Sequence, residues 1–157
     1  INSTTLKELD FNVSVGKVVW NQVKDILTSD NTRTRLIYSS DIINNKLSMS
    51  TYSNVDKKNY IEKDGINDVI LVVNRGYGKG KYKFNHCIID CDFDYLIENH
   101  LICIKSNTKL TKRNLINKYK KIINSFNSSK TMEFIDIYFG NNAINTVELQ
   151  QIVPITF

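Results

Sequence analysis

The apolar residues of this chain fall into several short runs and one long periodic stretch. The clearest run, Val69 to Val73, is apolar at every position, which is typical of a strand buried on both faces. Short apolar runs elsewhere predict further strands, and none approaches the roughly 20 residues needed to cross a bilayer. The other predicted strands are 34–38, 87–89, 101–104 and 134–139.

Helical periodicity is clearest in the segment 111–126. Its apolar residues recur with a period close to 3.6, and Thr111 is of the type that caps a helix N-terminus. Shorter helices are predicted over 56–62, which Asp64-Gly65 would close, and over 145–151 before Pro154. Polar composition predicts loops or turns at 28–34, 39–41 and in the Asp-rich stretch between the strands at 87–89 and 101–104.

Strands and helices are interspersed without a regular βαβ alternation, which predicts an α+β fold. We find no linker, repeat or low-complexity tract, so residues 1–157 are predicted to form a single domain, a twisted mixed β-sheet with flanking helices. A chain of this length can bury a core without disulfide or metal support. Because the sequence begins at Ile1 rather than Met, we expect it to have been excised from a longer protein.

Composition favours an anionic partner. The chain carries 21 basic and 16 acidic residues, a formal charge of +5, and its isoelectric point is near 9.0. Three cysteines, an odd number without tight spacing, argue against a disulfide scaffold and for a reducing, cytoplasmic location. We expect no membrane partner.

The segment that follows the 69–73 run combines glycines, cations and tyrosines. Three glycines at alternate positions, 76, 78 and 80, allow the backbone to approach a partner closely. Their spacing matches neither a P-loop nor a dinucleotide-binding motif. Lysine and arginine supply phosphate contacts, and tyrosines can lie against sugars or bases. The predicted DNA-contacting residues here are Asn74, Arg75, Tyr77, Lys79, Lys81 and Lys83.

A second candidate site lies around the single tryptophan. Trp20 is expected to pack inward with Val19, Val23 and Leu27. Asn and Gln can pair bidentately with adenine in the major groove, and Arg or Lys with guanine. The predicted base-contacting residues are therefore Asn21, Gln22, Lys24, Arg33, Arg35 and the turn residue Ser39.

Between Glu98 and Glu133 the sequence has eight cations and no acid. Most of them lie on the predicted 111–126 helix, where they are either further phosphate contacts or simply a solvated helix face. Both interpretations stay open.

Catalytic and metal-binding readings find less support. His86, Cys87, Cys91, His100 and Cys103 do not have a strong zinc spacing, so we predict no metal site. A Mg²⁺-dependent nuclease would use Asp90, Asp92 and Asp94, or the acids between Glu62 and Asp68, and this is the main alternative. A third reading is an RNA-binding or protein-binding module with an incidental basic face.

Three segments carry a resemblance to a known family. In order along the chain they are Val15–Gln22, Leu36–Ile42 and Val69–Gly78, and the helix 111–126 followed by 146–155 matches the family's C-terminal end. Together they resemble the target recognition domain of N6-adenine DNA methyltransferases, in particular the C-terminal specificity domain of TaqI-like or Eco57I-like enzymes. That domain is related to type I restriction-modification specificity subunits.

The resemblance implies sequence-specific binding of double-stranded DNA and a separate catalytic methyltransferase domain that uses S-adenosylmethionine. That domain's Asn/Asp-Pro-Pro-Tyr/Phe signature needs two prolines, and this chain has only Pro154. We therefore expect no catalytic residue and no cofactor in this chain, which would recognise DNA for a site-specific adenine methyltransferase without methylating it alone.

Overall fold

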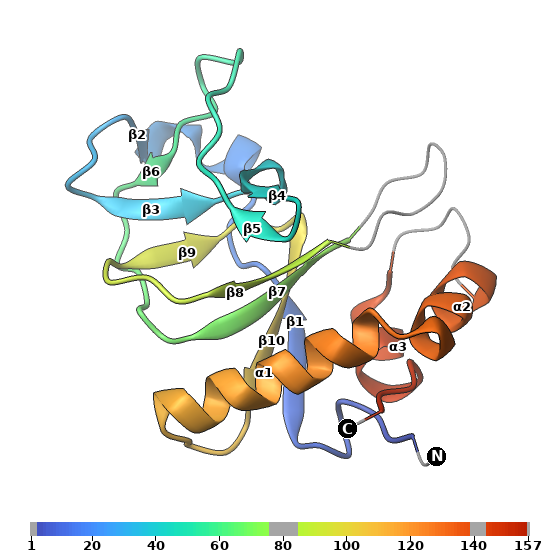
Figure 1. The fold of residues 1–157 in the computed structure, drawn as a ribbon. Coiled ribbons are helices and arrows are strands. Elements are labelled where there is room, and N and C mark those ends of the chain that lie inside the picture. The colour runs from blue at the N-terminus through green and yellow to red at the C-terminus, as the bar shows by residue number, and fades with distance from the viewer. Residues whose placement is uncertain (1–2, 76–84, 139–143, 157) are drawn as a thin grey trace.

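The apolar run of the sequence becomes an inner strand, Ile70–Asn74 (β7), of a four-stranded antiparallel sheet. A computed structural model describes residues 3–75, 85–138 and 144–156. The sheet has the order β1-β10-β7-β8 (Figure 1). Its other strands are β1 Phe11–Val15, β8 His86–Ile89 and β10 Leu101–Ser106.

The side chains of β7 alternate between two cores, as expected for a strand buried on both faces. Leu71 and Val73 belong to a cluster with helical residues, whereas Ile70 and Val72 belong to a cluster with residues of a second sheet. All four are at most 1% exposed. The prediction for this strand is confirmed.

The second sheet is made of short strands in the order β2-β6-β3-β9. The middle strands β6 and β3 are antiparallel, and β3 pairs in parallel with β9. A two-stranded hairpin, β4-β5, lies beside it, and its turn residues Asn44 and Asn45 have positive φ angles of 51° and 61°. The strands are β2 Leu27–Thr28, β3 Thr34–Ile37, β4 Ile42–Ile43, β5 Lys46–Leu47, β6 Tyr60–Ile61 and β9 Tyr95–Ile97.

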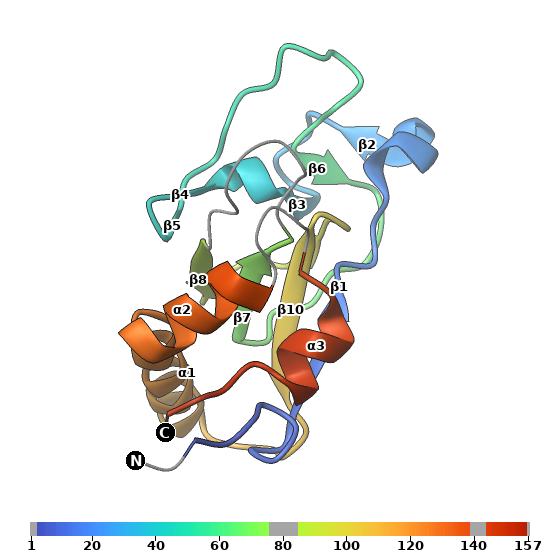
Figure 2. The same cartoon turned by 90° about the vertical axis from the view of Figure 1, so that its right-hand side faces the viewer.

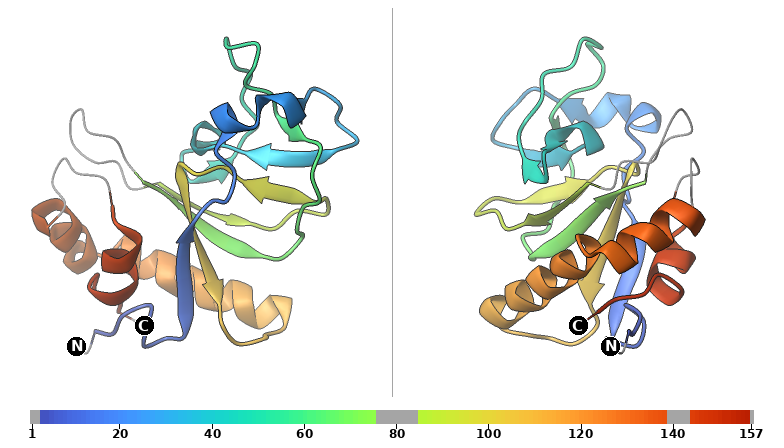
Figure 3. Two further views of the ribbon diagram at one scale, coloured as in Figure 1. Left: turned by 180° about the vertical axis from the view of Figure 1, so that it is seen from behind. Right: turned by 45° about the vertical axis from the view of Figure 1, so that its right-hand side comes forward.

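Three α-helices gather on the side of the first sheet that faces away from the second (Figures 1 and 2). The longest, α1 Lys112–Phe126, buries Tyr119, Ile122 and Phe126, and Thr111 Oγ1 accepts from Asn114 N at its start. The other two are α2 Ser129–Tyr138 and α3 Thr146–Gln151. No helix in the described part of the chain is long and apolar enough to span a membrane. Figure 3 shows β1 and β10 in front of α1 when the molecule is seen from behind.

The α+β fold class is confirmed, and so are the helices predicted over 111–126 and 145–151. Two local predictions are wrong. The segment 134–138 is helical, as the second half of α2, and not a strand. The segment 56–62 forms no helix, because Tyr60–Ile61 pairs as a short strand with both β2 and β3. The predicted single mixed sheet is divided into two four-stranded sheets and the β4-β5 hairpin.

Candidate nucleic-acid interface

Six of the predicted DNA-contacting residues lie at one end of the two sheets, where β7 ends, β10 begins and β3 gives way to a 3-10 helix, Ser39–Asp41. Another 3-10 helix, Trp20–Gln22, reaches the same end. We call this group the strand-end cluster. It consists of Asn21, Gln22, Lys24, Ser39, Asn74 and Arg75.

A fully buried carboxylate, Glu98, ties these segments together. Its Oε2 accepts from Trp20 N at 3.4 Å, and its Oε1 accepts from His100 N at 2.9 Å and contacts His100 Nδ1. Its own backbone N–H donates to the carbonyl of Ile37, two residues before Ser39. A buried carboxylate is tolerated only when donors surround it, so Glu98 fixes the start of the Trp20–Gln22 turn against the sheet.

Arg75 is held at the same corner. Its backbone N–H donates to His100 O at 3.3 Å, and its Nη1 donates to Asn99 O and Oδ1 at 3.2 and 3.1 Å. Asn99 in turn donates through its backbone to Val18 O at 2.7 Å and through Nδ2 to Gly16 O at 3.3 Å. One short network therefore connects the end of β7 to the segment that leads into Trp20.

The polar members of the cluster are accessible to a ligand. Asn21, Gln22 and Lys24 are exposed, whereas Ser39, Asn74 and Arg75 are half-buried. Trp20 packs only partly inward, against a cluster that contains the buried Leu27. The exposed amides on a fixed turn can donate to and accept from a base edge, which is the chemistry that adenine recognition requires.

Lys57, which sequence reasoning missed, lies between three aromatic rings at this end. Its Nζ is 4.3 Å from the ring centroid of Tyr52, 4.7 Å from that of Tyr38 and 5.6 Å from that of Trp20. Lys24 Nζ lies 5.6 Å from the Trp20 ring as well. These distances are typical of cation–π contacts. In the sequence, the one signal for this group of cation–π contacts is the presence of Tyr52 and Lys57 in the same long polar segment.

The Tyr38 and Tyr52 rings are positioned by hydrogen bonds. Tyr38 Oη donates to Lys58 O at 2.6 Å, and Tyr52 Oη donates to Oδ1 of the buried Asp41 at 2.9 Å. Burial, with nearby carboxylates, raises the pKa of both phenols above the ordinary value. Both tyrosines therefore stay neutral at physiological pH.

Arg33 and Arg35 are not part of the strand-end cluster. They lie at the opposite end of β3 from Ser39, where Arg35 N donates to Asp94 O at 3.1 Å. The strand β3 therefore separates Arg33 and Arg35 from Ser39, and their contact with DNA stays a prediction. The predicted contacts Tyr77, Lys79, Lys81 and Lys83 lie outside the described residues.

The cations of α1 lie on its outer surface. Lys112, Arg113, Lys120 and Lys121 are exposed and Lys118 is half-buried, while the opposite side of the helix packs on the first sheet. Lys112 Nζ is paired with Asp90 Oδ1 at 2.8 Å. This arrangement is equally suited to a solvated face and to phosphate contacts.

Among the described residues, no three His, Cys, Asp or Glu side chains come together as metal ligands would. All three cysteines are free thiols, and burial raises the pKa of each, for Cys103 to about 11. A protonated thiol is a weak nucleophile and a weak ligand.

No protein-family model matches the chain, and neither does any curated protein sequence.

Proposed function

We propose that this chain is a DNA target-recognition module that binds double-stranded DNA sequence-specifically. It would serve an N6-adenine DNA methyltransferase whose catalytic domain, with its S-adenosylmethionine, lies outside this chain. The observation that carries the proposal is the strand-end cluster, in which amides and cations from segments far apart in sequence lie at the same end of the two sheets, tied together by the hydrogen bonds of Glu98.

Each part of the cluster has a role in this proposal. The side chains of Asn21 and Gln22 read base edges, because an amide can pair bidentately with adenine. Lys24 and Arg75 contact phosphates or guanine. Lysines at positions 79, 81 and 83 follow Arg75 along the chain and add to the net charge of +5, which favours a polyanion.

The decisive experiment is selection of bound duplexes from a random pool, followed by fluorescence anisotropy with the selected duplex and a scrambled one. We expect a defined motif and a steep fall of affinity with salt, since each neutralised phosphate contributes about −0.9 to the log–log slope. Asn21→Ala or Gln22→Ala should cost roughly 1–3 kcal/mol on the selected duplex and little on the scrambled one. Asn67→Ala, at an exposed asparagine before the start of β7 and so at the opposite end of that strand from Arg75, is the matched control and should bind like the parent chain.

Lys24→Ala should instead weaken both duplexes and lower the salt slope by about 1, as expected for a phosphate contact. No enriched motif, or a salt-independent affinity, would overturn the proposal. Nicking of a plasmid in Mg²⁺ would favour the nuclease alternative, and a preference for single-stranded RNA over duplex DNA would favour an RNA-binding module.

A further inference from the structure

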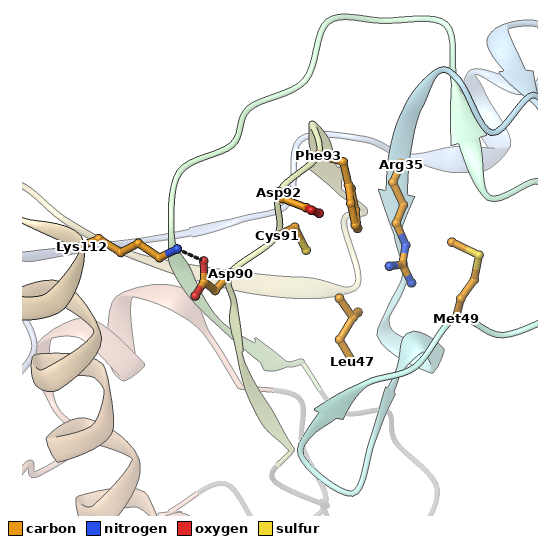
Figure 4. A pocket seen from close by; sticks show the side chains of 8 residues that line it. All are labelled: Arg35, Leu47, Met49, Asp90, Cys91, Asp92, Phe93 and Lys112. Atoms are coloured by element: carbon orange, nitrogen blue, oxygen red, sulfur yellow. Dashed lines mark ion pairs between the residues drawn. The ribbon is translucent and has the colours of Figure 1, made fainter.

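A cleft of about 450 Å³ opens at the far end of β3, away from the strand-end cluster (Figure 4). It lies between the start of β3, the chain around β5 and the loop that follows β8. We call it the Arg35 cleft. It is lined by Arg35, Leu47, Met49, Asp90, Cys91, Asp92, Phe93 and Lys112.

The guanidinium of Arg35 is the unusual feature of this cleft. Its Nε and Nη2 atoms are shielded from solvent, and neither has a hydrogen-bond partner among the described residues. Buried N–H donors without acceptors are costly, so nearly all are paired in folded proteins. Nε and Nη2 lie on one edge of the planar group and present two parallel donors. That edge matches a ligand with two adjacent acceptors.

The side chain cannot easily turn this edge elsewhere. The Arg35 backbone is fixed by pairing with Tyr60 on one side and Tyr95 on the other. Its guanidinium lies 5.6 Å from the Phe93 ring centroid, in a cation–π contact. Figure 4 shows Arg35 between Phe93 and Met49.

The charges of the lining residues select among ligands with two acceptors. Arg35 and Lys112 are cations, while Asp90 and Asp92 are anions, so the lining carries no net charge. Lys112 is already paired with Asp90 at 2.8 Å, which leaves Arg35 and Asp92 as one donor edge and one acceptor. A carboxylate or phosphate would be repelled by Asp92, whereas a neutral ligand with both acceptors and donors would not.

Guanine has this combination. Its O6 and N7 are adjacent acceptors that arginine pairs bidentately, and its N1–H and N2–H₂ are donors suited to a carboxylate. Its flat faces suit Phe93 and the apolar side chain of Leu47, and the volume lies in the ordinary range for small-ligand sites. We propose that the Arg35 cleft binds a guanine base, with the Nε–Nη2 edge of Arg35 on O6 and N7, Asp92 on the N1–H and N2–H₂ side, and Phe93 against the ring.

Binding requires a small rearrangement, since the donor edge is covered in the free protein. Met49 and Phe93 are 43% and 42% exposed, so either can move without disturbing the core. Met49 is unbranched with several rotatable bonds and can swing aside at little cost. Met49→Ala should therefore keep or raise the affinity for guanine, whereas Phe93→Ala should lower it.

The base could come from a free nucleotide or from an unpaired position in a nucleic acid. If the base belongs to a nucleic acid, the cleft is part of the proposed DNA recognition and this inference rests on the proposed function. If the base belongs to a free nucleotide, the inference is independent of the proposed function. Binding to free guanosine and GMP therefore tests the cleft independently of duplex selection, and single-stranded oligonucleotides with one dG or one dA test the second source.

The experiment is a titration of the full chain with guanosine, GMP and AMP. Binding is monitored by the NMR chemical shifts of the backbone amides and of the arginine Nε–H groups. We expect saturable shifts at Arg35 and residues 90–93 with guanosine and GMP alike, and at least tenfold weaker binding of AMP. Inosine monophosphate keeps O6 and N7 but lacks the 2-amino group, so its binding should be intermediate. Arg35→Lys keeps the charge but loses the two-donor edge, and should weaken GMP binding at least tenfold, while Lys24→Ala should not change it.

Several results would overturn the proposal. These are equal binding of AMP and GMP, binding of GMP and inorganic phosphate but not of guanosine, or unchanged affinity in a folded Arg35→Lys protein. Absence of guanosine and GMP binding would also overturn it. If Arg35→Lys fails to fold, the surface variant Phe93→Ala decides, because unchanged affinity there is incompatible with ring stacking. A successful duplex selection without guanine binding would remove only this cleft and leave the proposed function standing.

Discussion

Replacement of Glu98 tests whether one buried carboxylate organises the strand-end cluster. Glu98 is 0% exposed and accepts from the backbone N–H groups of Trp20 and His100, with a further contact to His100 Nδ1. In Glu98→Ala these donors lose their acceptor and a cavity replaces the side chain. Breaking a buried charged network from one side typically costs about 3–5 kcal/mol.

That loss is a large share of the roughly 5–15 kcal/mol by which a domain is normally stable. At about 2–4 °C per kcal/mol for a chain of this size, Tm should fall by roughly 6–20 °C. Glu98→Gln keeps the shape and one acceptor oxygen, so it should lose about 1–3 kcal/mol. The exposed Glu62 offers a matched control, and Glu62→Ala should stay within about 0.5 kcal/mol of the parent chain.

Urea denaturation gives the free energies of unfolding, and the single tryptophan reports the local effect. Because Trp20 N–H bonds to Glu98, the native emission of Glu98→Ala should shift to the red as the Trp20–Gln22 turn loosens. Binding to a selected duplex should then fall even where the protein remains folded. A Glu98→Ala protein within 1 kcal/mol of the parent chain, with unchanged emission, would refute the idea that this carboxylate holds the corner.

Three further outcomes are expected. Lys57→Met retains the apolar stem but removes the ammonium from between three aromatic rings, so the free energy of unfolding in urea should fall by about 1–2 kcal/mol. Lys58→Met is the control and should lower it less. Equal losses in the two variants would argue against a stabilising cation–π contact at Lys57. Gly16→Ala would place a Cβ 2.2 Å from the carbonyl oxygen of Glu98, so thermal unfolding should show a loss of more than about 2 kcal/mol, and a neutral variant would contradict the packing. Burial lowers the pKa of His86 from its ordinary 6.5, so the unfolded chain takes up this proton first and stability should fall as pH drops below about 6.5. His86→Phe should reduce that fall between about pH 7.5 and 5.5, and an unchanged slope would assign the pH dependence to other groups.

Elements whose own sequence dominates their structure could be predicted. The strand β7 is apolar at nearly every position and is buried on both faces. The helices α1 and α3 each follow a residue that caps the helix N-terminus. The side chains of Thr111 and Asn145 accept hydrogen bonds from backbone N–H groups in the first turns of these helices. In these segments local preference and burial agree, which makes the local pattern a sufficient guide.

Elements whose structure depends on a partner distant in sequence could not be predicted. The segment 134–138 has aromatic and β-branched residues that favour a strand, but it continues a helix that begins at Ser129 and buries Thr131 and Ile135, which are one turn apart. The two residues of β6 pair with β2 and β3 at once, and this overrides a weak helical tendency. The Arg35 cleft was equally hidden, because the side chains around Arg35 come from segments more than ten residues away.

The separation of Arg35 from the strand-end cluster limits how the chain can contact a duplex. Arg35 and Ser39 are four positions apart (39 − 35), at most roughly 13 Å at about 3.3 Å per residue. With successive nucleotides of a strand about 3.4 Å apart, that span matches roughly four base-pair steps. A selected motif of about four base pairs or more would therefore be long enough to engage both ends of β3. A shorter motif would have room for one end only. The proposed contact would then be the strand-end cluster, where the side chains of Asn21 and Gln22 are exposed, and the Arg35 cleft would be free for a base from another source.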